Sequence, residues 1–170
     1  MELRAVRVKK SFVLIMALLL SACGYHLRGA MELPEGLKNV YLEGGSPQLS
    51  EQFNRAMKIS SVALASSPET AGMIVKIFNE ENQRRVLSLS SGGVANNFEL
   101  SYRFEYEIVD SQNKVLVVRQ PVEIKREYFN AQLAVIAKDN EETVILNEMY
   151  QQAVRTVINR ARLAFQAKSK

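Results

Sequence analysis

The sequence has few of the residues from which catalytic and metal sites are commonly built. Its 170 residues include one histidine, one cysteine and no tryptophan. Metal sites that need two histidines or several cysteines are excluded by count, and so is an internal disulfide. His26 lies three residues after the only cysteine, in a segment that we interpret below as a tether. A tether cannot hold a histidine base against a nucleophile, as Ser-His-Asp and Cys-His sites require.

Other patterns that could mimic a catalytic site are weak. Glu99, Glu105 and Glu107 share one side of a predicted strand, but Arg103 lies among them, which favours a solvated outer face. The glycine pairs at 44–45 and 92–93 lack the lysine and the strand–loop–helix context of a phosphate-binding loop. We therefore predict a non-enzymatic protein with no cofactor and no metal site. An envelope hydrolase is the least favoured alternative.

Long hydrophobic runs are also scarce, and the clearest one is at the N-terminus. Residues 12–20 are nine consecutive apolar residues. A membrane-spanning helix needs roughly 20. The run follows a basic stretch that holds four Lys or Arg residues against one acid, which is the arrangement of a secretory signal. We predict a signal peptide over residues 1–22.

A lipobox ends this signal. Leu-Ser-Ala at 20–22 places small residues before Cys23, and in such sites the thiol receives a diacylglycerol and the chain is cut before the cysteine. An ordinary signal-peptidase site or a buried helix is the alternative. Each buried CH₂ group contributes about 0.8 kcal/mol, so two or three acyl chains would hold the protein on a membrane. Because Gly24 replaces the aspartate of many inner-membrane lipoproteins, we expect the outer membrane.

Removal of the signal changes the charge argument. The full chain has a net charge of +4, whereas the chain from Cys23 keeps 18 basic and 17 acidic residues. A net charge of +1 gives no reason to expect nucleic acid as a partner. The C-terminal end nevertheless has no acid after Glu148, which indicates either a solvated basic face or a contact with anionic lipid or glycolipid. Its basic residues are Arg155, Arg160, Arg162, Lys168 and Lys170.

Periodicity predicts the elements of the mature chain. Residues 23–36 are predicted to be the lipidated tether and 37–170 a single domain. Strong alternation over Phe98–Ile108 predicts a strand with one buried face, and Pro121 predicts an edge position or a bulge in the following strand. The expected order is a strand at 37–42, a helix at 47–58, an ambiguous edge strand at 60–67, strands from 73 to about 87, 98–108 and 115–128, a short helical turn at 130–137 and a long helix from 141 to about 167.

These elements predict an α+β fold. It is a two-layer sandwich in which a mostly antiparallel or mixed sheet of about four strands is covered on one face by two helices. For the last strand we expect Leu116, Val118, Val122 and Ile124 to share one face. The last helix is expected to begin anew at Asp139-Asn140 and to bury an apolar stripe. That stripe contains Leu146, Met149, Tyr150, Ala153, Val157, Ala161 and Ala164.

Three motifs in the mature chain resemble a known family. They are Cys-Gly-Tyr-His-Leu-Arg-Gly at 23–29, Ala-Lys-Asp-Asn-Glu at 137–141 followed by Glu-Met-Tyr at 148–150, and the Pro-x-x-Leu-Lys-x-Val entry to the first strand at 34–40. Together they resemble the LptE (RlpB) family of LPS-assembly lipoproteins. The resemblance implies a non-enzymatic lipoprotein on the periplasmic face of the outer membrane. It also implies two partners, the β-barrel translocon LptD, which it plugs and helps to assemble, and lipopolysaccharide.

The resemblance also implies ligand-binding residues. Lys138, in the Ala-Lys-Asp-Asn-Glu motif, corresponds to an LPS contact, and an ammonium on a flexible stem suits a lipid A phosphate. A solvated lysine before a helix cap is the alternative. The family also uses a basic residue in the loop at 88–93, where this chain has no charge. Arg84 and Arg85, just upstream, are candidate substitutes or else surface charges at a strand end.

A second function stays open at this point. A stand-alone envelope lipoprotein that carries or chaperones a hydrophobic ligand would need a sizeable apolar cavity between helices and sheet. The aromatic row Phe98, Tyr102, Phe104 and Tyr106 could line such a lipid groove. A core covered by helices is the more ordinary interpretation of the same row.

Overall fold

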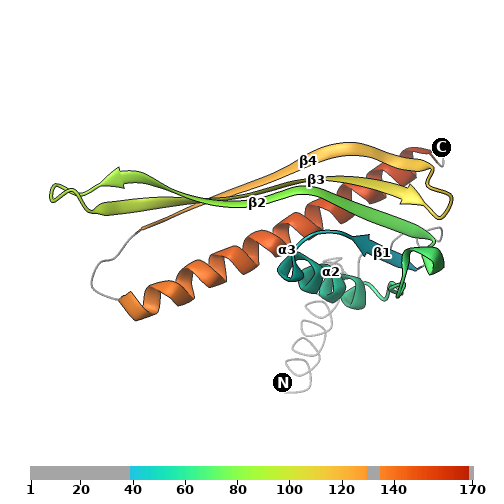
Figure 1. Ribbon diagram of the computed structural model, residues 1–170, viewed down its shortest axis with the longest axis horizontal. Coiled ribbons are helices and arrows are strands. Elements are labelled where there is room, and N and C mark those ends of the chain that lie inside the picture. Colours follow the sequence, from blue (N-terminus) through green and yellow to red (C-terminus); the bar gives the residue numbers. More distant parts are fainter. Residues whose placement is uncertain (1–38, 130–134, 169–170) are drawn as a thin grey trace, which may run out of the picture. The chain divides into compact units, whose positions relative to one another are not determined.

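The computed structural model describes residues 39–129 and 135–168, with side chains from 39 to 129 and from 141 to 167. The predicted signal peptide at 1–22, lipid attachment at Cys23 and tether at 23–36 lie outside the described residues. The elements in chain order are β1 (Val40–Glu43), α2 (Pro47–Ile59), the 3-10 turn η2 (Pro68–Thr70), β2 (Met73–Leu89), β3 (Ala95–Asp110), β4 (Val115–Phe129) and α3 (Val135–Lys168), as labelled in Figure 1.

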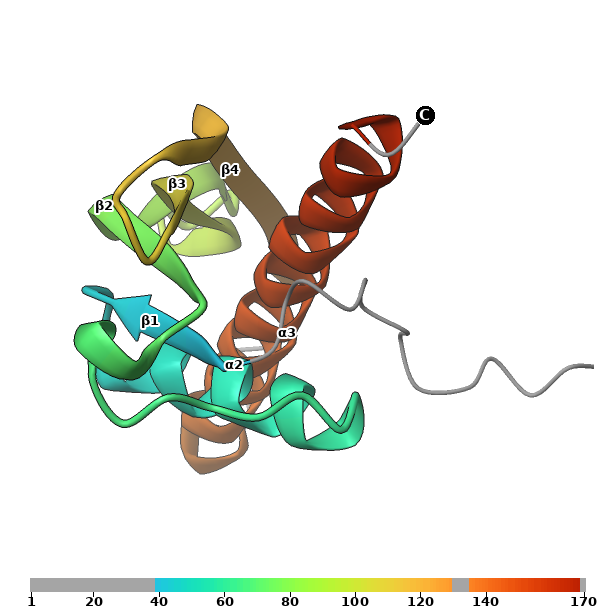
Figure 2. The same ribbon diagram turned by 90° about the vertical axis from the view of Figure 1, so that its right-hand side faces the viewer.

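The strands form one mixed sheet in the order β1-β2-β3-β4. β1 pairs with β2 in parallel, and the other two pairs are antiparallel. Residues of α2, α3 and three strands line one apolar space, which shows that both helices pack on the same face of the sheet. Figure 2 shows the two helices on one side of the sheet. The predicted α+β fold, a mixed four-stranded sheet covered by two helices, is confirmed.

The strict alternation of β3 builds most of the core. Tyr102, Tyr106 and Ile108 have no exposed surface, and Leu100 and Phe104 are 2% exposed. They face the helices, and Tyr150 of α3 lies edge-on to Tyr102 with ring centroids 4.6 Å apart. The aromatic row is therefore core beneath α3, as its more ordinary interpretation has it.

Local sequence signals place α2. The Ser46 hydroxyl accepts a hydrogen bond from the Leu49 amide at 3.2 Å, and Pro47 occupies the first turn. The strand before it turns at Gly44, whose φ of +78° brings it so close to Ile77 that a Cβ would lie 3.0 Å from the Ile77 carbonyl oxygen. Glycine is thus required at this turn for both backbone angle and space.

α3 differs from the prediction at its start. The helix runs unbroken from Val135, so the separate turn and the new start at Asp139-Asn140 were wrong. Aspartate and asparagine cost only tenths of a kcal/mol inside a helix, whereas starting a second helix repeats the cost of nucleation. Continuing the helix through both residues is therefore cheaper than breaking it. The remaining part of the predicted turn, 130–134, lies outside the described residues.

β4 is an edge strand, as Pro121 predicted, and it also carries a register shift. Tyr106 pairs with Gln120, but Ile108 pairs with Val117, so β4 has one extra residue in between. Before this extra residue, odd-numbered instead of even-numbered side chains of β4 face the helices. Val117 is buried at 5% exposure and Val118 is 71% exposed, so the prediction that Val118 shares the buried face with Val122 and Ile124 was wrong.

A smaller core lies on the opposite face of the sheet. Ile74 and Val109 are cross-strand partners, and they form a buried cluster with Ala71 against the half-buried Tyr41 and Ala65. The segment that covers them is the one with the ambiguous strand pattern. It makes a single bridge, between Leu64 and Val40, instead of a strand.

Candidate functional site

The two arginines proposed as LPS contacts point to opposite faces of the sheet. Arg84 pairs across the ladder with Leu100, whose side chain is buried beneath α3, and Arg85 pairs with Glu99 on the other face. Successive strand residues alternate between faces. The structure therefore separates two residues that are neighbours in the sequence.

Arg84 joins β2 to the first turns of α3. Its Nη1 lies 3.0 Å from Glu142 Oε2, and its Cζ lies 4.8 Å from the centre of the Phe98 ring. Phe98 stacks on Tyr128 with ring centroids 5.5 Å apart, and the Tyr128 hydroxyl donates to the same Glu142 oxygen at 2.6 Å. The Glu142 carboxylate of α3 thus binds both the Arg84 guanidinium and the Tyr128 hydroxyl. The guanidinium also lies over the ring of Phe98, which stacks on Tyr128.

Two members of this group, Arg84 and Tyr128, have raised pKa values. The hydrogen bond and charge of Glu142 raise the pKa of Arg84. Burial, followed by the hydrogen bond to Glu142, raises the pKa of Tyr128 to about 12. At neutral pH the guanidinium is therefore charged and the phenol is a neutral donor. Glu142 can consequently accept from both.

Lys138 lies in α3 four residues before Glu142, and its side chain lies outside the described residues. Positions four apart share one face of a helix, with Cβ atoms roughly 5–6 Å apart. Position 138 therefore lies one helical turn before Glu142, the residue that Arg84 binds, whereas Arg85 binds Glu99 on the other face of the sheet.

Arg85 has a structural partner of its own. Its Nε lies 2.7 Å from Glu99 Oε1, and the Glu99 side chain is 10% exposed. Removing one partner of a buried ion pair leaves an uncompensated charge. Arg85 therefore neutralises a nearly buried carboxylate, whatever else it contacts.

The hairpin between β2 and β3 carries an exposed apolar surface that sequence reasoning missed. Residues 86–98 contain no charged residue, and the turn of this hairpin lies at the left-hand end of the sheet in Figure 1. The exposed aliphatic side chains there are Val86, Leu87, Leu89 and Val94, at 39–62%. The uncharged run of 13 residues was the available sequence signal. An amphiphile bound at Arg84 would find apolar surface beside it.

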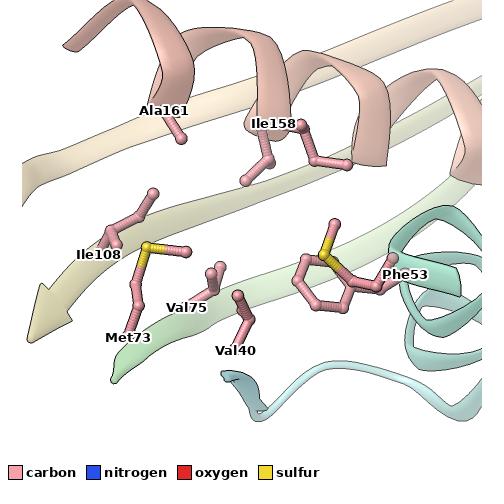
Figure 3. Close-up of a pocket in the computed structure, with 9 residues that line it drawn as sticks. Val40, Phe53, Met73, Val75, Ile108, Ile158 and Ala161 are labelled. Atoms are coloured by element: carbon pink, nitrogen blue, oxygen red, sulfur yellow. The ribbon is translucent and has the colours of Figure 1, made fainter. Parts of the chain in front are cut away.

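One small cavity lies between the helices and the sheet. The cavity, of about 20 Å³, is lined by nine apolar residues of β1, β2, β3, α2 and α3. Figure 3 shows seven of them labelled around it, among them Val40, Phe53 and Ile158. Such a volume holds about one water molecule, whereas small-molecule pockets measure hundreds of Å³. This cavity therefore gives no support to a carrier of hydrophobic ligands.

The described residues contain neither a cluster of metal ligands nor a helix suited to span a membrane. Among residues 39–129 and 141–167, no three potential metal ligands of the His, Cys, Asp and Glu types gather into a group. No helix in the described part of the chain combines the length and the apolar character that crossing a membrane requires.

Two LPS-assembly lipoproteins are similar to this chain over most of its length. The chain is 24% identical over 151 residues to the LPS-assembly lipoprotein LptE of Photorhabdus laumondii, which covers 87% of this chain and 82% of that protein. It is also 24% identical over 149 residues to the LPS-assembly lipoprotein LptE of Yersinia enterocolitica, covering 86% of this chain and 71% of the relative.

Solved structures share the fold. The solution NMR structure of an uncharacterized lipoprotein B from Nitrosomonas europaea matches with a TM-score of 0.69 and 26% identity, over 85% of this chain and 93% of that one. The crystal structure of the rare lipoprotein B from Shewanella oneidensis matches with a TM-score of 0.60 and 18% identity, over 78% and 96% of the two chains.

The family model described as LptE, lipopolysaccharide-assembly, matches residues 37–161. This span contains all four strands, α2 and most of α3. The resemblance inferred from the three sequence motifs is therefore confirmed, and the chain belongs to the LptE family of LPS-assembly lipoproteins.

Proposed function

We propose that this protein is an outer-membrane lipoprotein, anchored on the periplasmic face through lipids on Cys23, that binds lipopolysaccharide and serves as plug and assembly factor of the LptD β-barrel. It acts without catalysis or a cofactor. The observation that carries the proposal is the family match over residues 37–161, on a fold that contains both helices and all four strands.

The LPS contact that we propose lies where α3 begins. Lys138 and Arg84 supply two cations at one end of the sheet, and arginine and lysine are the usual partners of phosphate groups. The uncharged hairpin tip beside them exposes aliphatic side chains to the acyl part of the same amphiphile. The prediction for Arg85 requires that the glycolipid also reach the opposite face.

Purification through this chain from detergent-solubilised outer membranes tests the partner. We expect a large β-barrel protein in stoichiometric amount, identified by mass. Recovery of the chain only as a free monomer would contradict the plug role, because a plug stays inside its barrel.

Lys138→Glu is expected to weaken LPS binding about tenfold or more, because it replaces an attraction to phosphate by a repulsion. The measurement is LPS binding in vitro at fixed salt. Lys114→Glu, in the exposed β3–β4 turn, makes the same charge change at the other end of the strands and should leave the affinity unchanged. Equal affinities for both variants and the parent would remove Lys138 from the site.

Arg84→Ala is expected to weaken LPS binding about tenfold, and Arg85→Ala is expected to leave it unchanged in protein that is still folded. The reason is geometric, since Arg84 shares the α3 face with position 138 and Arg85 binds Glu99 on the other face. The same LPS titration decides between them. A loss confined to Arg85→Ala would place the glycolipid on the helix-free face instead.

A further inference from the structure

The arginine that we propose for the LPS contact is already bound to an acid of the same chain. Arg84 Nη1 lies 3.0 Å from Glu142 Oε2, and the Tyr128 hydroxyl donates to that same oxygen at 2.6 Å. Both donors stand on the sheet, in β2 and β4, whereas the acceptor stands on α3. An anionic ligand of Arg84 must therefore either share these donors with Glu142 or displace its carboxylate.

The position of this carboxylate is one that a phosphate oxygen can take. A guanidinium binds carboxylate and phosphate oxygens with the same planar set of N–H donors, and a phenol donates to either. Glu142 Oε2 therefore marks the place of an anion's oxygen between a charged donor and a neutral one. The raised pKa values of Arg84 and Tyr128 keep both groups protonated and able to donate at neutral pH.

The two donors have supports that do not depend on Glu142. The Arg84 guanidinium lies over the Phe98 ring, with Cζ 4.8 Å from its centre, and Phe98 stacks on its cross-strand partner Tyr128. Both rings are buried, at 8% and 6% exposure. The ion pair itself reaches solvent, because the Glu142 side chain is 25% exposed and that of Arg84 is 52% exposed. Water and salt weaken such a pair, so another anion can compete for the donors.

Charge decides which anions can compete with Glu142. A phosphate monoester carries about −1.5 to −2 charges at pH 7 and three acceptor oxygens, whereas a carboxylate carries a single charge. A carboxylate from a ligand would only replace one that is already tethered beside the donors, and the ligand would lose freedom of motion on binding. A neutral headgroup would have no charge to offer the guanidinium. A phosphate therefore displaces Glu142 most easily.

We propose that Glu142 is an internal competitor for the ligand, and that it makes the Arg84 contact selective for phosphate monoesters over carboxylates. The inference rests on the proposed LPS contact at Arg84 and goes beyond it, because it assigns the selectivity of that contact to an acid of α3. When a phosphate binds, Arg84 and Tyr128 donate to its oxygens, and the Glu142 side chain turns towards solvent.

Removal of the competing charge tests the selectivity. The probes are lipid A with both phosphates and an analogue with carboxymethyl groups in their place, titrated in detergent at fixed salt. We expect the parent to prefer the phosphates about tenfold, and Glu142→Gln to bind both probes more tightly with a preference of only about twofold. Glu142→Asp keeps the charge but withdraws it by one methylene, so its affinities should be intermediate. Glu141→Gln, at the exposed neighbouring position of α3, removes the same charge and should match the parent.

Three other outcomes would overturn the inference. Weaker binding by Glu142→Gln would show that Glu142 positions Arg84 for the ligand instead of competing with it. Unchanged affinities, or the same gain in Glu141→Gln, would show that the acid does not occupy the site of the anion. Circular dichroism checks the fold, and Glu142→Asp carries the test if the glutamine variant is unfolded. A parent that binds both probes equally contradicts only the competitor, whereas a parent that does not bind phosphorylated lipid A contradicts the LPS contact in the proposed function.

Discussion

Cys23→Ser is expected to abolish the incorporation of labelled palmitate and to leave residues 1–22 attached to the chain. The thiol is the only acceptor for the diacylglycerol in a sequence with a single cysteine, and a serine hydroxyl is a much poorer nucleophile. Cleavage at a lipobox follows lipidation, so both signals fail together. Metabolic labelling and the intact mass of the membrane-associated protein measure the two effects.

The matched control for this variant is Ser21→Ala. It keeps a small residue two positions before the cysteine, so labelling and cleavage should match the parent. The energetic reason for the large effect is that one acyl chain binds a membrane only marginally, whereas two or more hold it stably. A parent protein that carries no fatty acid, or that begins at a residue other than Cys23, would contradict the anchor.

The parts of the fold that follow from local period were predictable, and the parts set by pairing were not. The β3 strand sustains period two over Phe98–Ile108, so its buried face could be read directly. The face of β4 changes at an extra residue between Val117 and Gln120, and that residue is defined only against β3. Simple alternation along β4 therefore predicted that Val118 would be buried with Val122 and Ile124, whereas it is exposed.

The candidate site was predictable to a similar degree. The alternation of side chains along a strand is enough to predict from the sequence that Arg84 and Arg85 point to opposite faces. Which arginine faces α3 depends on the pairing of β2 with β3, and the contact that Arg84 then makes joins it to Glu142, 58 positions later in the sequence. Contacts of this separation follow from the packing of the last helix on the sheet. No local pattern of either segment encodes them.

Glu80→Ala is expected to lower the free energy of unfolding by about 3 kcal/mol. Glu80 lies at a register shift of β2, where Asn79 has a φ of +52° and the pairing resumes only at Glu81. Its carboxylate accepts from the Ser46 amide at 2.5 Å, from the Ser46 hydroxyl at 2.7 Å and from the Tyr102 hydroxyl at 2.8 Å. A negative charge there also favours the N-terminus of α2.

The cost is large because Tyr102 cannot turn to water. Its side chain has no exposed surface, and burial, followed by the hydrogen bond to Glu80, raises its pKa. Alanine at 80 leaves the phenol buried without its acceptor and the amide and hydroxyl of the N-cap residue Ser46 without theirs. Urea unfolding measures the loss. In a double-mutant cycle, Tyr102→Phe should lower the free energy of unfolding much less in the Glu80→Ala background than in the parent. The reason is that the hydrogen bond from the Tyr102 hydroxyl to Glu80 is already absent in that background.

Glu81→Ala is the neighbouring control for this prediction. Glu81 pairs with Arg103 at 2.5 Å on the exposed face of the sheet, and Arg103 lowers its pKa. Surface pairs of this kind contribute little to stability because water and salt screen them. The unfolding midpoint should therefore remain close to that of the parent. Equal losses of stability for Glu80→Ala and Glu81→Ala would contradict the special role of the Glu80 carboxylate at the register shift of β2. They would show that Ser46 and Pro47 alone suffice to begin α2.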